Sequence, residues 1–136
     1  YDTAIILMDH VTSIHQDLRN GIGNLSLIAM RHKELESITS LRAYNPVLTV
    51  EDYDLHLRRI AGLTSKALEL VDRDFHDDSM FYPFLTIMMP VVMMADWIGK
   101  RDDMIHTFLD AVAPAIRRVA TGGVEIAEMA STRQQA

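Results

Sequence analysis

Three histidine–carboxylate pairs stand four residues apart, a spacing that places both groups on one face of a helix. Such a pair can share a metal ion or simply form an ion pair at the surface. Di-iron helical bundles use Glu-x-x-His motifs together with further inward-pointing glutamates, and this chain contains no Glu-x-x-His. We therefore interpret the pairs as surface ion pairs and predict no metal site. They are Asp52/His56, Asp72/His76 and His106/Asp110.

A second polar group is the run His76-Asp77-Asp78. A His-Asp doublet is the core of one class of metal phosphohydrolases, and a doubled Asp opens the magnesium motif of prenyl-transferring enzymes. Both chemistries need further ligands or cations close by, and the next residues, Ser79-Met80-Phe81, supply none. The run therefore indicates a polar turn at the end of a helix.

A third group surrounds His15. The run Asp17-Leu18-Arg19-Asn20 resembles the block that follows the phosphoacceptor histidine of sensor histidine kinases, which lies on a long helix of a dimeric four-helix bundle. Here Gln16 holds the histidine position, and His15 stands one residue earlier, about 100° around a helix. Two interpretations stay open: an ordinary exposed polar face, or a phosphotransfer-type domain centred on His15. The polar-site candidates are His15, Asp17, Arg19 and Asn20.

The most unusual segment is the run from Met80 to Ala95, which has no charged residue and holds five of the nine methionines. It is shorter than the roughly 20 residues that span a membrane, so we predict no membrane span. A helix that is apolar on every side is normally buried on every side. Its side chains could form plain core, a contact with a partner, or a pocket for an apolar small molecule. The candidates for such an interface or pocket are Met80, Phe84, Met88, Met89, Met93 and Trp97.

Composition limits the remaining possibilities. The chain has 136 residues, the size of one domain, and we assign residues 1–136 to a single domain. It has no cysteine, which excludes disulfides, thiolate catalysis and cysteine-bound metals and slightly favours the cytoplasm. Its net charge of −6 disfavours nucleic acid as a partner. Neither a glycine-rich phosphate loop nor a nucleophile elbow is visible, so no cofactor is predicted.

Apolar residues recur at helical spacing, which predicts an all-α fold, an antiparallel four-helix bundle. Thr49 and Asp52 form a predicted capping box for the second helix. The seam of the first helix favours one continuous helix, although its two glycines allow a break at Asn20–Asn24. A further break at Thr121–Gly123 would give five or six helices in all. The predicted helices are Thr3–Leu41, Val50–His76, Met80–Ile98 and Asp103–Ala130.

These helices would differ in length. An unbroken first helix would measure about 58 Å and the second about 40 Å, at 1.5 Å per residue. Such an overhang, and an apolar helix in need of cover, predict a homodimer or a subunit of a larger complex. The preferred function is a non-catalytic helical interaction or regulatory module. The alternative is a sensor or carrier that binds a small molecule beside the third helix.

Overall fold

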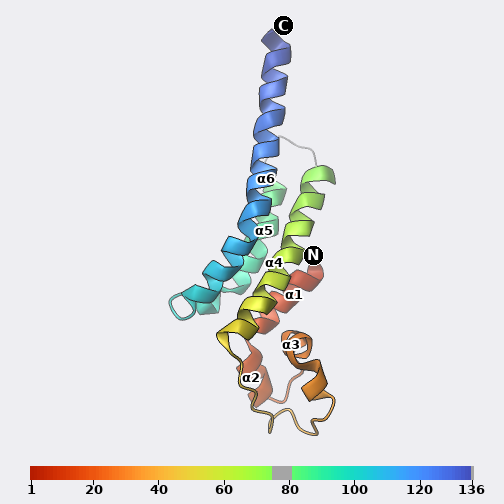
Figure 1. The fold of residues 1–136 in the computed structure, drawn as a ribbon, viewed down its shortest axis with the longest axis vertical. Helices are drawn as coiled ribbons and strands as arrows, with labels where there is room; N and C mark the ends of the chain where they lie inside the picture. Colours follow the sequence, from red (N-terminus) through yellow and green to blue (C-terminus); the bar gives the residue numbers. More distant parts are fainter. Residues whose placement is uncertain (75–80, 136) are drawn as a thin grey trace.

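The computed structural model describes residues 1–74 and 81–135, with side chains described for residues 1–73 and 81–120. Every regular element in these ranges is helical, which confirms the all-α class (Figure 1). The elements are α1 (Asp2–Val11), α2 (Ile14–Arg19), α3 (Leu25–Leu35), α4 (Val50–Asp74), α5 (Phe81–Met93), the short 3₁₀ helix η1 (Ala95–Trp97) and α6 (Asp102–Gln135).

The long helices pack into an elongated bundle (Figure 1). α4 and α6 lie side by side and run in the same direction. α5, which stands between them in the sequence, runs the opposite way and returns the chain to the end of the bundle where α4 began. Two contacts mark this parallel arrangement. Arg101 lies over the ring of Tyr53 near the start of both helices, and Arg118 pairs with Glu69 farther along both. α1 packs against α4 and α5, and α3 covers α1 at one end of the bundle.

The predicted continuous first helix is wrong, because the chain breaks at the alternative position around Gly21. Gly21 has φ +67°, a left-handed conformation that a residue with a side chain adopts only at a cost. Its N–H donates to the Leu18 carbonyl, and the Ile22 N–H donates to the Asp17 carbonyl. This pair of bonds is the Schellman motif, which ends α2. α3 then starts at Asn24, whose side chain accepts from the Leu27 N–H at 3.0 Å.

A second interruption, which the sequence analysis did not predict, separates α1 from α2 at Thr12 and Ser13. The Thr12 hydroxyl donates to the Asp9 carbonyl at 2.9 Å, and the Ser13 hydroxyl lies 3.3 Å from the carbonyl of His10. Short hydroxyl side chains that bond backbone groups in this way compete with helix continuation. The expected first helix of about 58 Å therefore does not exist, and its overhang beyond the second helix is lost as an argument for a partner.

The start of α4 confirms the predicted capping box. The Thr49 N–H donates to the Asp52 carboxylate at 2.8 Å, and the Asp52 N–H donates to the Thr49 hydroxyl at 3.2 Å. Both orphan donors at this helix start are thus satisfied reciprocally. Most of the predicted apolar stripe of α4 is buried, including Tyr53, Leu57 and Ile60.

The two remaining helices differ from the predicted bounds. α5 ends at Met93, and η1 replaces the last turn of the predicted third helix. Pro90 lies inside α5, and the helix continues past it. α6 runs through Thr121–Gly123 without a break, so the predicted interruption at that point is wrong.

The core consists of two unequal clusters of buried apolar residues. The larger one joins α1, α3, α4, η1 and α6 and includes Met8, Leu57, Trp97 and Phe108. The smaller one lies between α4 and α6, with Ile87 of α5 packed against it. Its buried members are Leu68, Ala115 and Val119. We name these three residues, together with Ile87, the apolar end.

Candidate functional site

The residues around His15 form a turn rather than a face of a long helix. His15 and Arg19 are exposed on the six-residue helix α2, and Asn20 is exposed just after it. Asp17 is the only one of the four candidates with a clear structural role. Its carboxylate accepts from the Ser13 hydroxyl at 3.1 Å and from the Asn24 amide at 2.9 Å. Asp17 therefore fixes the path of the chain between α2 and α3.

Neither of the two histidine–carboxylate pairs that lie within the described residues forms an ion pair. Asp52 binds Arg31 of α3 at 2.5 Å instead of contacting His56. His106 and Asp110 are both exposed on α6, and the pair Asp72/His76 and the run 76–78 reach outside the described residues. Within residues 1–73 and 81–120, no three histidine or acidic side chains come close enough together to hold a metal ion.

His56 instead belongs to a buried hydrogen-bond chain across three helices. Its side chain is 1% exposed, and its Nε2 lies 2.9 Å from the hydroxyl of Ser26 on α3. The Ser26 hydroxyl, also buried, donates to the Leu7 carbonyl of α1 at 2.5 Å. Asn24 lies beside this chain, 2% exposed, and its amide donates to the His10 carbonyl at 2.7 Å. We name Asn24, Ser26 and His56 the polar corner.

The direction of these bonds argues against catalysis by Ser26. Because the hydroxyl hydrogen points to the Leu7 carbonyl, the Ser26 oxygen accepts a hydrogen bond from the Nε2–H of His56. A nucleophilic serine needs the opposite direction, with the hydroxyl donating to the histidine. Nδ1 of His56 faces the guanidinium of Arg59 at 3.4 Å. Burial first, and then the charge of Arg59, lowers the pKa of His56 from 6.5 to about 4. His56 is therefore a neutral structural residue.

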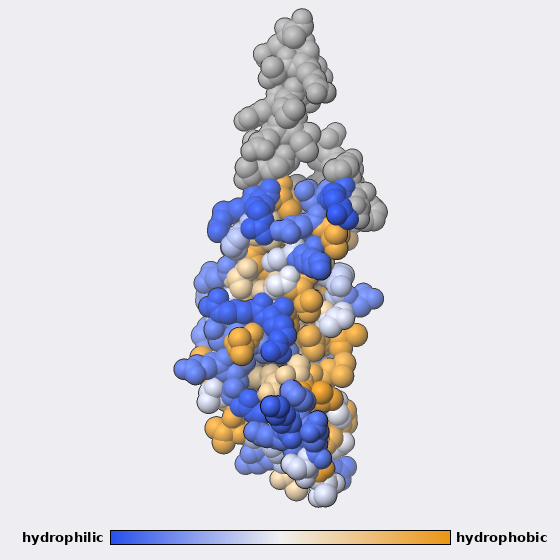
Figure 2. Space-filling view, turned by 45° about the vertical axis from the view of Figure 1, so that its right-hand side comes forward, coloured by the Kyte–Doolittle hydropathy of each residue, from blue (hydrophilic) through white to orange (hydrophobic). Residues whose placement is uncertain are grey.

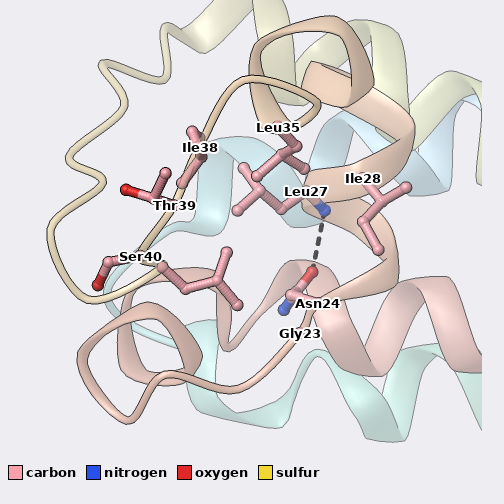
Figure 3. A pocket seen from close by; sticks show the side chains of 9 residues that line it. Gly23, Asn24, Leu27, Ile28, Leu35, Ile38, Thr39 and Ser40 are labelled. Carbon is pink, nitrogen blue, oxygen red and sulfur yellow. Dashed lines mark hydrogen bonds between the residues drawn. The ribbon is translucent and has the colours of Figure 1, made fainter.

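A hollow of about 230 Å³ lies next to the polar corner, between α3 and the following loop (Figure 3). Leu27, Leu35 and Ile38 point into it, whereas the hydroxyls of Thr39 and Ser40 point away from it. The Asn24 side chain at its edge already caps α3. This hollow therefore offers apolar walls and no free polar group that would orient a ligand.

One side of α5 exposes several large apolar side chains. Phe84 is 58% exposed, Val92 is 53% exposed and Met89 is 41% exposed. Figure 2 shows hydrophobic side chains gathered along the right-hand edge of the molecule. The chain therefore does not cover its own apolar helix. We name this surface the α5 face, and it consists of Phe81, Tyr82, Phe84, Leu85, Met89 and Val92.

The other candidates from the Met-rich segment have different positions. Trp97 is buried and meets Tyr53 edge to face, with ring centroids 6.1 Å apart. Met93 is partly buried against the larger core cluster, and Met88 is half-buried. Met80 lies outside the described residues. The predicted candidates therefore do not share one surface. Phe84 and Met89 are exposed, whereas Met88, Met93 and Trp97 are partly or fully buried.

A second hollow, of about 220 Å³, opens where the α5 face meets the apolar end. Its walls come from three helices, and every wall residue is apolar. Phe84 belongs both to this wall and to the α5 face. The wall residues are Leu68 of α4, Pro83, Phe84 and Ile87 of α5, and Ile116 and Val119 of α6.

The chain matches no protein-family model, no curated protein and no solved structure. None of the helices, over the residues that the structure describes, combines the length and the apolar character needed to cross a membrane.

The sequence did not predict the polar corner. It also did not predict that α4 and α6 would contribute walls to the second hollow. Ser26 and His56 are 30 positions apart and carry no motif, so only the packing of α3 on α4 brings them together. Asn24 was available as a signal, because an asparagine before an apolar helical run is a good N-cap. Leu68 and Ile116 look like ordinary stripe residues in the sequence.

Proposed function

We propose that the protein is a non-catalytic helical interaction module that pairs with a second copy of itself through the α5 face. One observation carries this proposal. The helix has no charged residue from Phe81 to Ala95, yet large apolar side chains on one side of it face solvent. Contiguous exposed apolar surface on a small domain is a common mark of an association site.

The spacing of residues along the α5 face suits helix pairing. The exposed Phe81, Leu85 and Val92, together with the half-buried Met88, follow one another at steps of four, three and four residues. This is the spacing of a seam along which two helices pack side chains into each other's gaps. Methionine adds adaptability, because its flexible side chain fits irregular surfaces.

The exposed area is large enough for a weak dimer. Each large side chain of the α5 face is about half exposed, and an aromatic side chain buries 150–250 Å² when it is fully covered. The six residues together therefore offer roughly 500 Å² per subunit, or about 1,000 Å² for a pair. That total lies at the lower limit of specific interfaces, so we expect a dimer that dissociates on dilution.

A second copy suits this surface better than a different partner. Two identical subunits of net charge −6 repel each other, but the α5 face carries no charge, so a contact through it brings no like charges directly together. A twofold contact also uses the same patch on both subunits, so pairing leaves no copy of the patch exposed. A charged partner would find no complementary charge on α5.

The experiment is sedimentation velocity over a concentration series from about one to several hundred micromolar. Wild-type protein is expected to shift from monomer to dimer across this range. Met89→Glu and Val92→Glu are each expected to weaken the association at least tenfold, because a carboxylate would be buried without a partner. Circular dichroism checks that the variants keep their helical content.

Leu55→Glu is the matched control, since Leu55 is exposed on α4 and does not belong to the α5 face. It should leave the association unchanged. A wild-type chain that stays monomeric at several hundred micromolar would refute the proposal. So would a dimer that the two α5 variants weaken no more than the control does.

A further inference from the structure

The proposed self-association through the α5 face does not account for the second hollow, which is lined by residues of α4, α5 and α6. It lies beside the apolar end, where Leu68, Ala115 and Val119 form a small core cluster among the described residues. The hollow measures about 220 Å³ and is open to solvent on one side. The described residues of α4, α5 and α6 thus leave an apolar recess at this point.

The chemistry of the walls selects the kind of occupant. All six wall residues are hydrocarbon side chains, so the hollow offers no donor, acceptor or charge. The neighbouring Thr86 hydroxyl is already used, because it donates to the Tyr82 carbonyl at 2.8 Å. Water needs two to four polar partners to remain in such a space. The walls therefore favour an apolar occupant over both water and a polar ligand.

The size of the hollow sets an upper limit on the occupant. An engineered apolar cavity of about 150 Å³ in another protein stays dry and binds benzene or xenon. The hollow here is moderately larger and opens to solvent beside Phe84, which gives an apolar molecule a route of entry. One six-membered ring, or a hydrocarbon chain of similar volume, fills the space, whereas a drug-sized ligand needs 300 Å³ or more.

We infer that the hollow between α4, α5 and α6 is a binding site for a small, uncharged, apolar molecule of about one ring. This inference does not rest on the proposed self-association. Phe84 forms one wall, Ile87 and Val119 form the floor against the apolar end, and Ile116 stands at the rim, where it is partly exposed. Selectivity comes from excluding polar groups, because a buried hydroxyl would find no hydrogen-bond partner there.

The probe is benzene, titrated into full-length protein with ¹³C-labelled methyl groups. Saturable shifts are expected at the methyl groups of Leu68, Ile87 and Val119, which line the hollow, and not at Leu57 of the main core. Hydroquinone has the same ring with two hydroxyls and is expected to bind at least tenfold more weakly than benzene. The titration is repeated on Met89→Glu protein, so that a failure of self-association cannot mask or imitate binding.

A filling variant supplies the decisive comparison. Ile116→Trp adds an aromatic ring at the rim and is expected to weaken benzene binding at least tenfold. Ile6→Trp places the same ring on the exposed side of α1, outside the hollow, and should leave binding unchanged. The inference is overturned by non-saturable benzene shifts, by equal affinity for hydroquinone, or by equal effects of the two tryptophan variants.

Discussion

The two ends of the bundle are stabilised by different means. At the polar corner, Ser26 and His56 join α1, α3 and α4 by hydrogen bonds that leave no described buried side-chain polar atom without a partner. At the apolar end, Leu68, Ala115 and Val119 hold α4 and α6 together by packing alone, and a hollow remains beside them. Directional hydrogen bonds fix the first end, although the hollow of about 230 Å³ lies beside it, whereas non-directional apolar packing holds the second.

This difference shows where the molecule can accept a guest. Hydrogen bonds fix both distance and angle, so a buried polar chain specifies one arrangement and tolerates little change. Apolar packing is proportional to area and tolerates a new neighbour of suitable size. We therefore expect binding and association at the apolar end and the α5 face, and structural rigidity at the polar corner.

Acid should produce the largest difference between the two ends. The pKa of His56 is about 4 in the folded chain against 6.5 normally, so the unfolded chain takes up this proton first. The free energy of unfolding therefore has its full value above about pH 6.5 and falls by about 3 kcal/mol as the pH drops to about 4. Urea unfolding at several pH values measures it.

Two further measurements assign this loss to the polar corner. His56→Leu should remove most of the slope between pH 6.5 and 4.5. Asp52 does not interfere, because Arg31 holds the pKa of its carboxyl below 3.8. Hydrogen-exchange protection factors, which correct for the slower intrinsic exchange in acid, should fall at pH 4.5 in α1 and α3 and change little where α4 meets α6. A uniform fall throughout the chain would contradict the contrast between the two ends.

Removal of one hydroxyl from the polar corner should have the next largest effect. Ser26→Ala leaves the buried Nε2–H of His56 without an acceptor, which should cost about 2 kcal/mol of unfolding free energy. Ser37→Ala is the control, because the Ser37 hydroxyl is exposed and bonds only the Glu34 carbonyl; we expect a change within about 0.5 kcal/mol. In the His56→Leu background the Ser26→Ala cost should shrink, and an unchanged cost would show that the two residues are not coupled.

The smallest effect concerns the turn that delivers Asn24 to the polar corner. Gly21→Ala should cost about 1 kcal/mol, because alanine is strained at φ +67°. A Cβ at this position would also lie 2.9 Å from the Nε of Arg42, a flexible side chain that can move aside. Gly23→Ala, where a Cβ would meet nothing within 4 Å, should be neutral in thermal unfolding. Equal costs for both would show that backbone strain is not the cause.

Local signals in the sequence were sufficient for the helices that begin and end by local rules. Thr49 and Asp52 predict the start of α4, and the reciprocal hydrogen bonds are present. Tyr53, Leu57 and Ile60 of α4 and Phe108 and Val112 of α6 stand at helical spacing and are buried, whereas Ile116, which continues the same spacing in α6, is exposed. In these cases, the residues that set the structure are neighbours along one helix.

Other features depend on contacts that the sequence does not reveal. The apolar spacing from Leu7 to Leu35 suggested one continuous helix. Instead, α2 ends in a Schellman motif at Gly21, and the chain turns back there. The role of His56 depends on Ser26, which folding brings within 2.9 Å. The sequence indicated that α5 needs cover, but not that Phe84 would be exposed while Trp97 is buried.

The parallel course of α4 and α6 affects how the chain reaches its final form. The ion pair between Glu69 and Arg118 joins residues 49 positions apart, and the whole of α5 lies between them. A loop of this length must close, at a cost in chain entropy, before α4 and α6 gain their mutual contacts. Closing such a loop costs more chain entropy than joining two neighbouring helices through a short turn. Leu57 and Ile60 of α4 can pack on α1 and α3, which precede them in the chain, whereas Leu68 is covered only when α6 is in place.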